Sequence, residues 1–274
     1  MTEPSLPDEI LDHYANRKDE DARLRGGQGR LEFARVQEIV RRNLPEGPQR
    51  ILDVGGATGV HAEWLLADGH QVHLIDPVPS HVARATESLG ANPAFSAAVG
   101  DARRLPAPDA SYDVVLLFGP LYHLLDRNER LTAWREAARA VVPGGLVFAT
   151  AISRFASLFE GLAQERIFDP AFAAMAERDL ATGQHLVPPG NTSWGTTAYF
   201  HRPDDLREEA SAAGLEVRDV VGVEGLAGWL GHLGPRWDDA ADREAVLRAA
   251  RATEHEPTLM GLSAHLVTVA RKGA

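Results

Sequence analysis

The feature of this sequence that most constrains its fold is a regular alternation of short apolar runs and helical patterns between residues 50 and 152. The apolar runs predict strands at 51–54, 71–76, 95–99, 113–118 and 146–152, and the helical patterns predict helices at 60–67, 80–89 and 128–141. This alternation implies a parallel sheet with helices on both faces. Right-handed crossovers then bring the carboxyl ends of the strands to one edge, where ligands bind.

The segment before the core is polar and is expected to form an N-terminal lid over residues 1–29. Within it, residues 21–28 have the character of a mobile connection. Apolar residues then recur at helical intervals and predict a helix over 30–44. That helix begins a core region that extends to residue 152.

The regular pattern breaks after Ser153, and residues 153–200 predict one or two helices followed by an irregular stretch. Because this insertion follows the fifth strand, we expect it to cover the ligand-binding edge as a cap. Residues 201–274 complete the core sheet. They predict a helix at 203–213, a strand at 215–223, an excursion over 225–256 with a helix near 240–252, and a last strand at 263–271.

Composition excludes several classes of protein. The 274 residues include 28 Lys and Arg against 39 Asp and Glu, a formal charge of −11, which argues against broad contact with nucleic acid. There is no cysteine, hence no disulfide, thiolate metal site or cysteine nucleophile. The N-terminus lacks a secretory pattern, and no apolar run approaches the ~20 residues that a membrane span needs. We therefore expect a soluble cytoplasmic protein.

The first predicted strand leads into a glycine-rich turn and then a helix, which is the layout of a nucleotide-cofactor site. Glycine lets the backbone approach a ligand closely, and the helix N-terminus presents free N–H groups. The glycines at 55, 56 and 59 do not fit the dinucleotide pattern G-x-G-x-x-G, which would need glycine at 57 and 60.

Three aspartates, Asp53, Asp76 and Asp101, follow or end successive predicted strands. Asp76 is placed to accept both hydroxyls of a ribose, and Asp101 to accept from an adenine amino group. Asp53 lies beneath the glycine loop, where it would repel a pyrophosphate by about 4 kcal/mol at ~4 Å and an effective dielectric of ~20. It would attract a cationic amino-acid end. S-adenosylmethionine has a partner group for each of the three carboxylates. The alternatives are that Asp76 and Asp101 are loop carboxylates with no ligand and that Asp53 is a purely structural cap.

At this point the chain resembles the class I S-adenosylmethionine-dependent methyltransferases. Their motif (D/E)-x-G-x-G-x-G is matched by Asp53, Gly55 and Gly59, with Ala57 in place of the middle glycine. Further matches follow in the family's order: Asp76, Asp101, the apolar run 112–118, and Val142-Pro143-Gly144-Gly145-Leu146. The resemblance covers residues 30–152 well and 200–271 more loosely.

This resemblance implies an α/β fold: a Rossmann-like, doubly wound, mostly parallel seven-stranded sheet with an antiparallel last strand, plus a helical cap insertion after strand five. It implies S-adenosyl-L-methionine as cofactor and S-adenosyl-L-homocysteine as product. The expected cofactor-binding residues are Tyr14 (from the lid), Asp53, Gly55, Gly56, Ala57, Gly59, Asp76, Pro77, Asp101, Ala102, Phe118 and Gly119.

The methyl acceptor is expected beyond the fourth strand, in the segment Phe118-Gly119-Pro120-Leu121-Tyr122-His123. The Asn/Asp-Pro-Pro-aromatic motif of enzymes that methylate base amines is missing there, and the segment is similar to a group of bacterial small-molecule methyltransferases. We predict His123 as a catalytic base and Tyr122 as an aromatic wall of the substrate site. The alternative for His123 is a helix cap or a packed core residue.

A second polar and aromatic cluster closes the cap insertion. Tyr199 and His201 alternate as in a strand, so both side chains face one side. We predict Tyr199 as substrate-binding and His201 as catalytic; otherwise they attach the cap to the sheet. His265, in the last strand, is expected to be a hydrogen-bonded core histidine. The scattered histidines give no metal-ligand spacing, so no metal site is predicted.

The predicted function is in-line transfer of a methyl group from S-adenosylmethionine to O, N or C of a small organic molecule. The alternatives are a protein methyltransferase, a non-catalytic protein that binds S-adenosylmethionine, and a nucleotide-dependent oxidoreductase, against which Asp53 argues. The expected partner is a small-molecule substrate, without nucleic acid or membrane, and the expected state is a monomer or homodimer.

Overall fold

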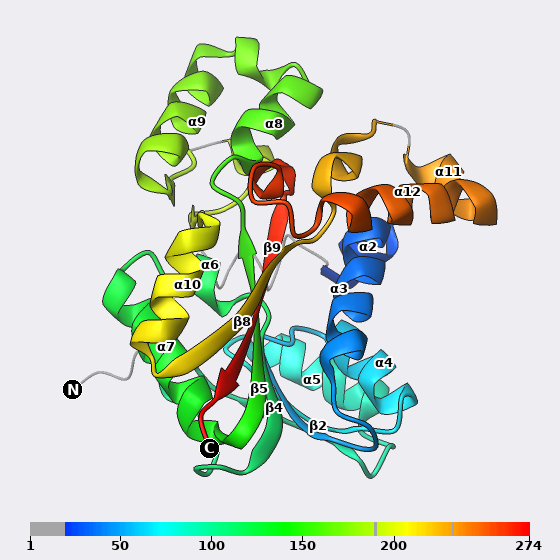
Figure 1. Cartoon of the computed structure of the whole chain (residues 1–274), viewed down its shortest axis with the longest axis vertical. Coiled ribbons are helices and arrows are strands. Elements are labelled where there is room, and N and C mark those ends of the chain that lie inside the picture. Colours follow the sequence, from blue (N-terminus) through cyan, green and yellow to red (C-terminus); the bar gives the residue numbers. More distant parts are fainter. Residues whose placement is uncertain (1–19, 189–190, 232) are drawn as a thin grey trace.

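A seven-stranded sheet forms the centre of the computed structural model, which describes residues 20–188, 191–231 and 233–274 (Figure 1). The strand order is β3-β2-β1-β4-β5-β9-β8. The strands are β1 (Arg50–Val54), β2 (Gln71–Asp76), β3 (Phe95–Val99), β4 (Tyr112–Leu117), β5 (Val141–Ile152), β8 (Leu215–Gly222) and β9 (His265–Lys272). Strands β1 to β5 pair in parallel, and β9 is antiparallel to both β5 and β8. The predicted fold class is confirmed.

The strands lie in register at the edge that holds the site. Val54 at the end of β1 pairs with Leu117 of β4, and Leu117 pairs with Ala149 of β5. Strand β5 then continues to Ile152, so it rises beyond its parallel neighbours and leads directly into the cap insertion. Consecutive Val and Leu residues make β4 buried on both faces, as expected for a central parallel strand.

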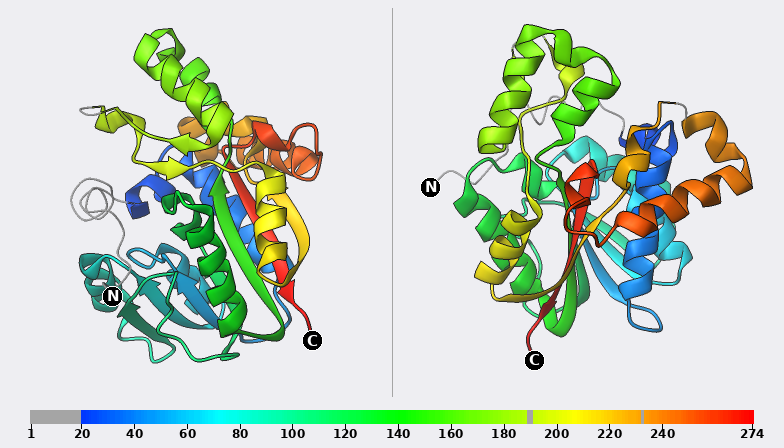
Figure 2. Two further views of the ribbon diagram at one scale, coloured as in Figure 1. Left: turned by 90° about the vertical axis from the view of Figure 1, so that its left-hand side faces the viewer. Right: turned by 45° about the horizontal axis from the view of Figure 1, so that its top comes forward.

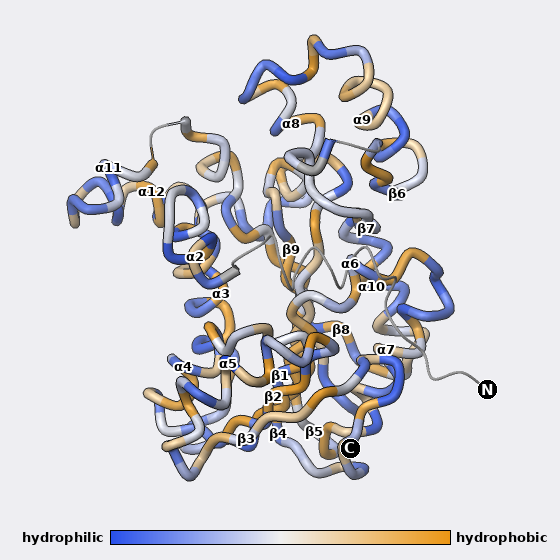
Figure 3. Tube along the Cα trace, turned by 180° about the vertical axis from the view of Figure 1, so that it is seen from behind, coloured by the Kyte–Doolittle hydropathy of each residue, from blue (hydrophilic) through white to orange (hydrophobic). Residues whose placement is uncertain are grey.

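Helices cover both faces of the sheet, as the alternation predicts. One face carries α3 (Gly29–Asn43), α4 (Val60–Ala67) and α5 (Pro79–Leu89), and the other carries α7 (Arg127–Ala140) and α10 (Pro203–Ala212). In α3 the residues Val36, Ile39 and Val40 recur at helical spacing and pack on the sheet. Figure 3 shows the strands as a mainly hydrophobic trace between helices with hydrophilic stretches.

The predicted cap is present between β5 and α10, and Figure 2 shows it standing beyond the carboxyl ends of the parallel strands. Its elements are α8 (Ala156–Ala163), η1 (Arg166–Phe168), α9 (Pro170–Thr182), β6 (Gln184–His185), η2 (Thr192–Trp194) and β7 (Ala198–Tyr199). Strands β6 and β7 form an antiparallel pair that was not predicted. Phe172, Met175 and Ala176 form a small core of their own.

The C-terminal excursion contains the helix predicted near 240–252, and further short helices that were not predicted. It contains η3 (Gly225–Trp229), α11 (Leu233–Asp238), α12 (Ala240–Thr253) and η4 (Met260–Leu262). Its apolar residues Ala227, Leu233, Trp237 and Val246 pack against Leu31 at the start of α3. Among the described residues, none of the helices combines the length and the apolar character that crossing a bilayer requires.

The expectation of a mobile connection at 21–28 is wrong for its first half, because Glu20–Arg25 form helix α2. Side-chain contacts explain why these residues form a helix. Leu24 is buried, Arg23 forms two hydrogen bonds with Glu32 of α3, and Arg25 forms an ion pair with Glu63 of α4. These tertiary contacts outweigh the weak local pattern.

One buried arginine joins the core to the cap. The Arg130 guanidinium in α7 donates to Glu209 of α10 at 2.8 Å and to the carbonyls of Leu124 and Leu125, both at 2.9 Å. It also lies over the ring of Tyr199 in β7, with 3.6 Å between Cζ and the ring centroid. Arg130 thus fixes α10, the hairpin of the cap and the loop after β4 relative to one another.

We expect Arg130→Ala to lower the free energy of unfolding by about 3–5 kcal/mol, because it leaves the Glu209 carboxylate buried without its partner. Urea denaturation of the full chain measures this. Arg127→Ala is the matched control, since Arg127 is exposed in the first turn of the same helix, and it should change the value by less than about 0.5 kcal/mol. Equal, small effects of the two substitutions would contradict the role of Arg130.

Candidate active site

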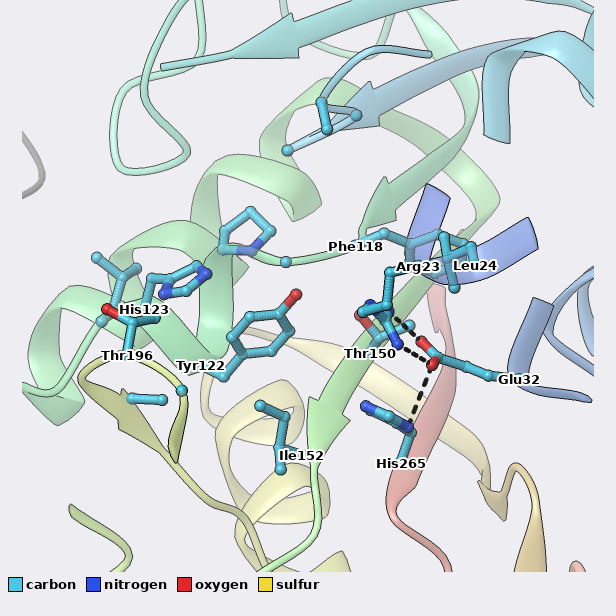
Figure 4. Close-up of a pocket in the computed structure, with 18 of the residues that line it drawn as sticks. Arg23, Leu24, Glu32, Phe118, Tyr122, His123, Thr150, Ile152, Thr196 and His265 are labelled. Atoms are coloured by element: carbon cyan, nitrogen blue, oxygen red, sulfur yellow. Dashed lines mark hydrogen bonds and ion pairs between the residues drawn. The ribbon is translucent and has the colours of Figure 1, made fainter. Parts of the chain in front are cut away.

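A cavity of about 340 Å³ lies between the carboxyl edge of the sheet and the cap (Figure 4). Its walls come from the loops after β1, β2, β3 and β4, from β5 and β9, and from α2, α3 and the cap. The residues predicted from sequence that line it are Gly55, Gly56, Ala57, Asp76, Pro77, Asp101, Ala102, Phe118, Gly119, Tyr122 and His123. The sequence therefore predicted most of the residues that line the cavity on the side of the sheet.

The turn after β1 touches the turn after β4, and glycine makes this approach possible. Gly55 has φ +78°, and a Cβ there would lie 2.8 Å from Cδ of Pro120 and 2.9 Å from the carbonyl oxygen of Phe118. Ala57 adopts φ +47°, a left-handed conformation that favours glycine, which explains why the family motif has glycine at this position. The backbone of the turn, free of long side chains, forms the cavity wall.

Asp76 is held rigidly with spare acceptor capacity. Its Oδ2 accepts from the backbone N–H of Ala57 at 2.9 Å, and its Oδ1 accepts from that of Val78 at 2.9 Å and lies 3.2 Å from Nδ1 of His81. A carboxylate has about four acceptor sites, so lone pairs remain. Since Asp76 lines the cavity, this geometry suits a vicinal diol.

Asp101 lines the cavity but is already paired. Arg103 donates to it through Nε at 2.9 Å and through Nη2 at 2.7 Å, and the Arg103 backbone N–H donates at 2.8 Å. Arg103 also contacts Glu129 of α7. The pairing fixes the Asp101 carboxylate and partly neutralises it, so a ligand amino group would meet a weaker charge here than the sequence suggests.

Asp53 requires a correction, because it does not line the cavity. Its side chain is fully buried beneath the loop: a Cβ on Gly56 would lie 2.6 Å from Oδ2 of Asp53. Neither carboxylate oxygen has a hydrogen-bond partner among the described residues. Burial, and secondarily the Asp76 carboxylate, raise the pKa of Asp53 to about 7. Asp53 therefore does not contact a ligand in the cavity. It can act on a cationic ligand only electrostatically, through the loop, and its carboxyl group is partly protonated near neutral pH.

Gly59 also lies outside the cavity and serves packing. It caps the N-terminus of α4 with φ +92°, and a Cβ there would lie 2.8 Å from Cδ1 of Leu89 and 3.6 Å from Cβ of Ala85 in α5. Its motif position reflects the close approach of two helices. Tyr14 lies outside the described residues.

Tyr122 and His123 end a short helix, α6 (Pro120–His123), that follows Gly119. Both line the cavity, and their rings meet edge to face with 4.6 Å between centroids. Figure 4 places Tyr122 near the middle of the cavity and His123 to one side, close to Thr196 of the cap. The structure thus brings the two predicted acceptor-side residues to the same cavity.

The predictions for Tyr199 and His201 are wrong, because neither residue lines the cavity. The side chains of residues 198–201 alternate as predicted, but the two predicted residues point away from the cavity. Ala198 and Phe200 line the cavity instead. His201 is completely buried with Nε2 3.5 Å from Glu209, and burial lowers its pKa despite that carboxylate. Tyr199 lies under Arg130, and Arg154 donates to its hydroxyl at 3.1 Å. Both residues attach the cap to the core, which is the alternative role that the sequence analysis gave for them.

The sequence missed a polar cluster at the other end of the cavity. Arg23 donates to Glu32, whose Oε2 lies 3.6 Å from Nδ1 of His265, and the same nitrogen is 2.6 Å from Glu224. Burial alone would lower the pKa of His265, but Glu32 and Glu224 outweigh it and raise the pKa to about 9. His265 is hydrogen-bonded, as predicted, but it is half-buried and lines the cavity instead of lying in the core. No sequence signal links these positions, since only the tertiary fold brings them together.

Glu32, Glu224 and His265 have ligand atoms within 4.8 Å of one another, a grouping that the scattered histidines did not predict. The carboxylates already bind Arg23 and the protonated His265, so the group is internally neutralised as an ion-pair network. This arrangement does not leave the imidazole Nδ1 available as a metal ligand.

The high pKa of Asp53 predicts a pH-dependent cost. An acid whose pKa is raised on folding destabilises the fold as pH rises from its unfolded value towards its folded one. We compare the unfolding free energy of Asp53→Asn with that of the wild type at pH 5 and at pH 7.5. We expect the difference, variant minus wild type, to be about 2–3 kcal/mol larger at pH 7.5 than at pH 5. Urea denaturation of both proteins at both pH values measures the change, and a difference that does not vary with pH would contradict the assignment.

Comparison with known proteins agrees with this geometry. Residues 51–145 match the family model described as methyltransferase domain. A demethylmenaquinone methyltransferase of Deinococcus radiodurans is 28% identical over 195 residues, covering 69% of this chain and 77% of the relative. A ubiquinone biosynthesis O-methyltransferase of Methylocella silvestris is 31% identical over 179 residues, covering 64% of this chain and 60% of the relative.

Among solved structures, a SAM-dependent methyltransferase from Methanosarcina mazei has a TM-score of 0.59 at 16% identity, covering 86% of this chain and 97% of that one. At this identity the similarity establishes the fold. The segment that matches the methyltransferase-domain family contains the glycine turn and Asp76. The cavity beside them is suited to S-adenosylmethionine. The domain match, the methyltransferase relatives and the shared fold together support a class I S-adenosylmethionine-dependent methyltransferase.

Proposed function

We propose that this methyltransferase acts on a small, largely apolar, ring-bearing molecule that binds beneath the cap. The observation that carries the proposal is one continuous cavity, which runs from the glycine turn to an aromatic wall formed by Phe200 and Trp194 of the cap and by Trp229 of η3. A cavity of about 340 Å³ under two helices accommodates a small molecule, whereas a protein substrate needs an open groove. The names of the two relatives, for demethylmenaquinone and ubiquinone biosynthesis, support a ring-bearing acceptor.

The sheet edge is the proposed cofactor site. Asp76 would accept the ribose hydroxyls, the turn at Gly55 and Gly56 would take the amino-acid end, and Asp101 with Ala102 would contact the adenine. When bound, S-adenosylmethionine supplies an electrophilic methyl group on a sulfonium. Because that leaving group is good, the chain's main task is to align the acceptor, which contributes about 7–11 kcal/mol in well-oriented systems.

Asp76 tests the cofactor site. Asp76→Asn keeps the shape but removes the charge from two hydrogen bonds, so we expect S-adenosylhomocysteine to bind about 10- to 100-fold more weakly. Isothermal titration calorimetry measures this, and the exposed Asp204→Asn is the matched control. Unchanged affinity in Asp76→Asn would place the ribose elsewhere.

His123 tests the acceptor side. If the acceptor is a hydroxyl, a base must remove its proton, and we propose His123 for this role. His123→Ala should then slow transfer by 10²- to 10⁴-fold with unchanged S-adenosylhomocysteine affinity. His255→Ala, on the surface at the end of α12, is the matched control. A rate change of less than about tenfold would show that His123 is not the base.

The substrate class is tested by measuring S-adenosylhomocysteine formation with a panel of hydroxybenzoates, catechols and quinols, and separately with unfolded proteins. We expect turnover with members of the small-molecule panel. Turnover with the proteins alone would favour the protein-methyltransferase alternative.

A further inference from the structure

We propose that His265 binds the acceptor molecule, with its Nε2–H holding an anionic oxygen such as a carboxylate or phenolate. The proposal rests on the proposed function, since it names the substrate class for the same cavity. It assigns the polar end of the cavity, opposite Tyr122 and His123, to recognition of the acceptor's charge.

The register of the sheet places His265 on the acceptor side. Val54, which ends β1 before the glycine turn, is level with Ala149 of β5 through Leu117. His265 pairs with Ile152, three residues further along β5, which is about 10 Å closer to the cap at ~3.3 Å per residue. Directly opposed residues in an antiparallel pair project to the same face, so His265 and Ile152 share the cavity face.

The hydrogen bonds fix the ring and leave one edge for a ligand. Nδ1 faces Glu224 at 2.6 Å, and Glu224 is itself anchored by the Ser263 hydroxyl at 2.8 Å and the His265 backbone N–H at 3.0 Å. The contacts that hold the ring among the described residues are all at Nδ1. Figure 4 shows the other edge of the ring turned away from Glu32, towards Ile152 and the middle of the cavity.

The charges around the ring favour an anionic ligand. In the described part of the chain, the charged groups facing His265 are Glu224 after β8, Glu32 from α3 and Arg23 from α2. They raise its pKa to about 9, so the ring is an imidazolium at neutral pH with a second N–H to donate. Among the described residues of this cluster, Arg23 and His265 carry as many positive charges as Glu32 and Glu224 carry negative ones, so the described cluster has no net negative charge to repel an anion. A charge-assisted bond is roughly twice as strong as a neutral one, and the adjoining walls are apolar.

The experiment compares benzoate with neutral benzamide, titrated by calorimetry into the full chain saturated with S-adenosylhomocysteine at pH 7.5. We expect His265→Gln to weaken benzoate binding about 10- to 100-fold and to leave benzamide binding unchanged. His255→Gln is the matched control and should change neither. Wild-type benzoate affinity should fall as pH rises through about 9, where His265 loses its proton.

A second variant protects the test against simple misfolding. Glu224→Gln keeps an acceptor for Ser263 but removes a carboxylate beside His265, so benzoate affinity should be lost at lower pH than in wild type. This shift in the pH profile is not expected from a residue that only packs.

Three results would overturn the proposal: equal losses for benzoate and benzamide in His265→Gln, no benzoate binding to wild type at millimolar concentration, or a matching loss of S-adenosylhomocysteine affinity. The last would assign the ring to the cofactor's own carboxylate. Failure of the proposed function is seen separately, as the lack of S-adenosylhomocysteine formation with any small acceptor.

Discussion

The contact between two glycine turns is the constraint on which the site depends. Gly55 after β1 and Gly119 before α6 bring the backbones so close that a side chain at residue 55 would collide with Pro120. This approach joins the cofactor side of the sheet edge to the segment that carries Tyr122 and His123. Parallel register makes the approach possible, because the strand ends at Val54 and Leu117 are level. The proposed donor and acceptor sites therefore share one cavity.

The cap is held above that edge by buried ion pairs and not by apolar packing alone. Arg130 and Glu209 connect both helices of one face, and Tyr199 and His201 fasten the hairpin of the cap to them. Such groups are costly to bury, and they fix a geometry that apolar contacts would leave adjustable. On the opposite side of the sheet edge, the Arg23 cluster joins α2 and α3 to β9 and lines one end of the cavity.

The sequence predicted the sheet, its helices and most residues on the sheet side of the cavity well, because each rests on local periodicity or on a short motif. It placed Asp76 at the cavity edge, where the structure has it, since strand ends converge in a parallel sheet. It misjudged Asp53, whose burial depends on the path of the loop above it, and Tyr199 and His201, whose alternation was right but whose face was not decided by spacing. It missed Arg23 and Glu32 and placed His265 in the core, because contacts between residues so distant in the chain leave no local pattern.

A crystal structure of the chain with S-adenosylhomocysteine tests this arrangement most directly. We predict electron density for the ribose on Asp76 and a sulfur atom that faces the cavity beneath Phe200 and Trp229, within reach of a molecule held between His123 and His265. A sulfur atom that faces solvent, with no path to the space under the cap, would rule this arrangement out.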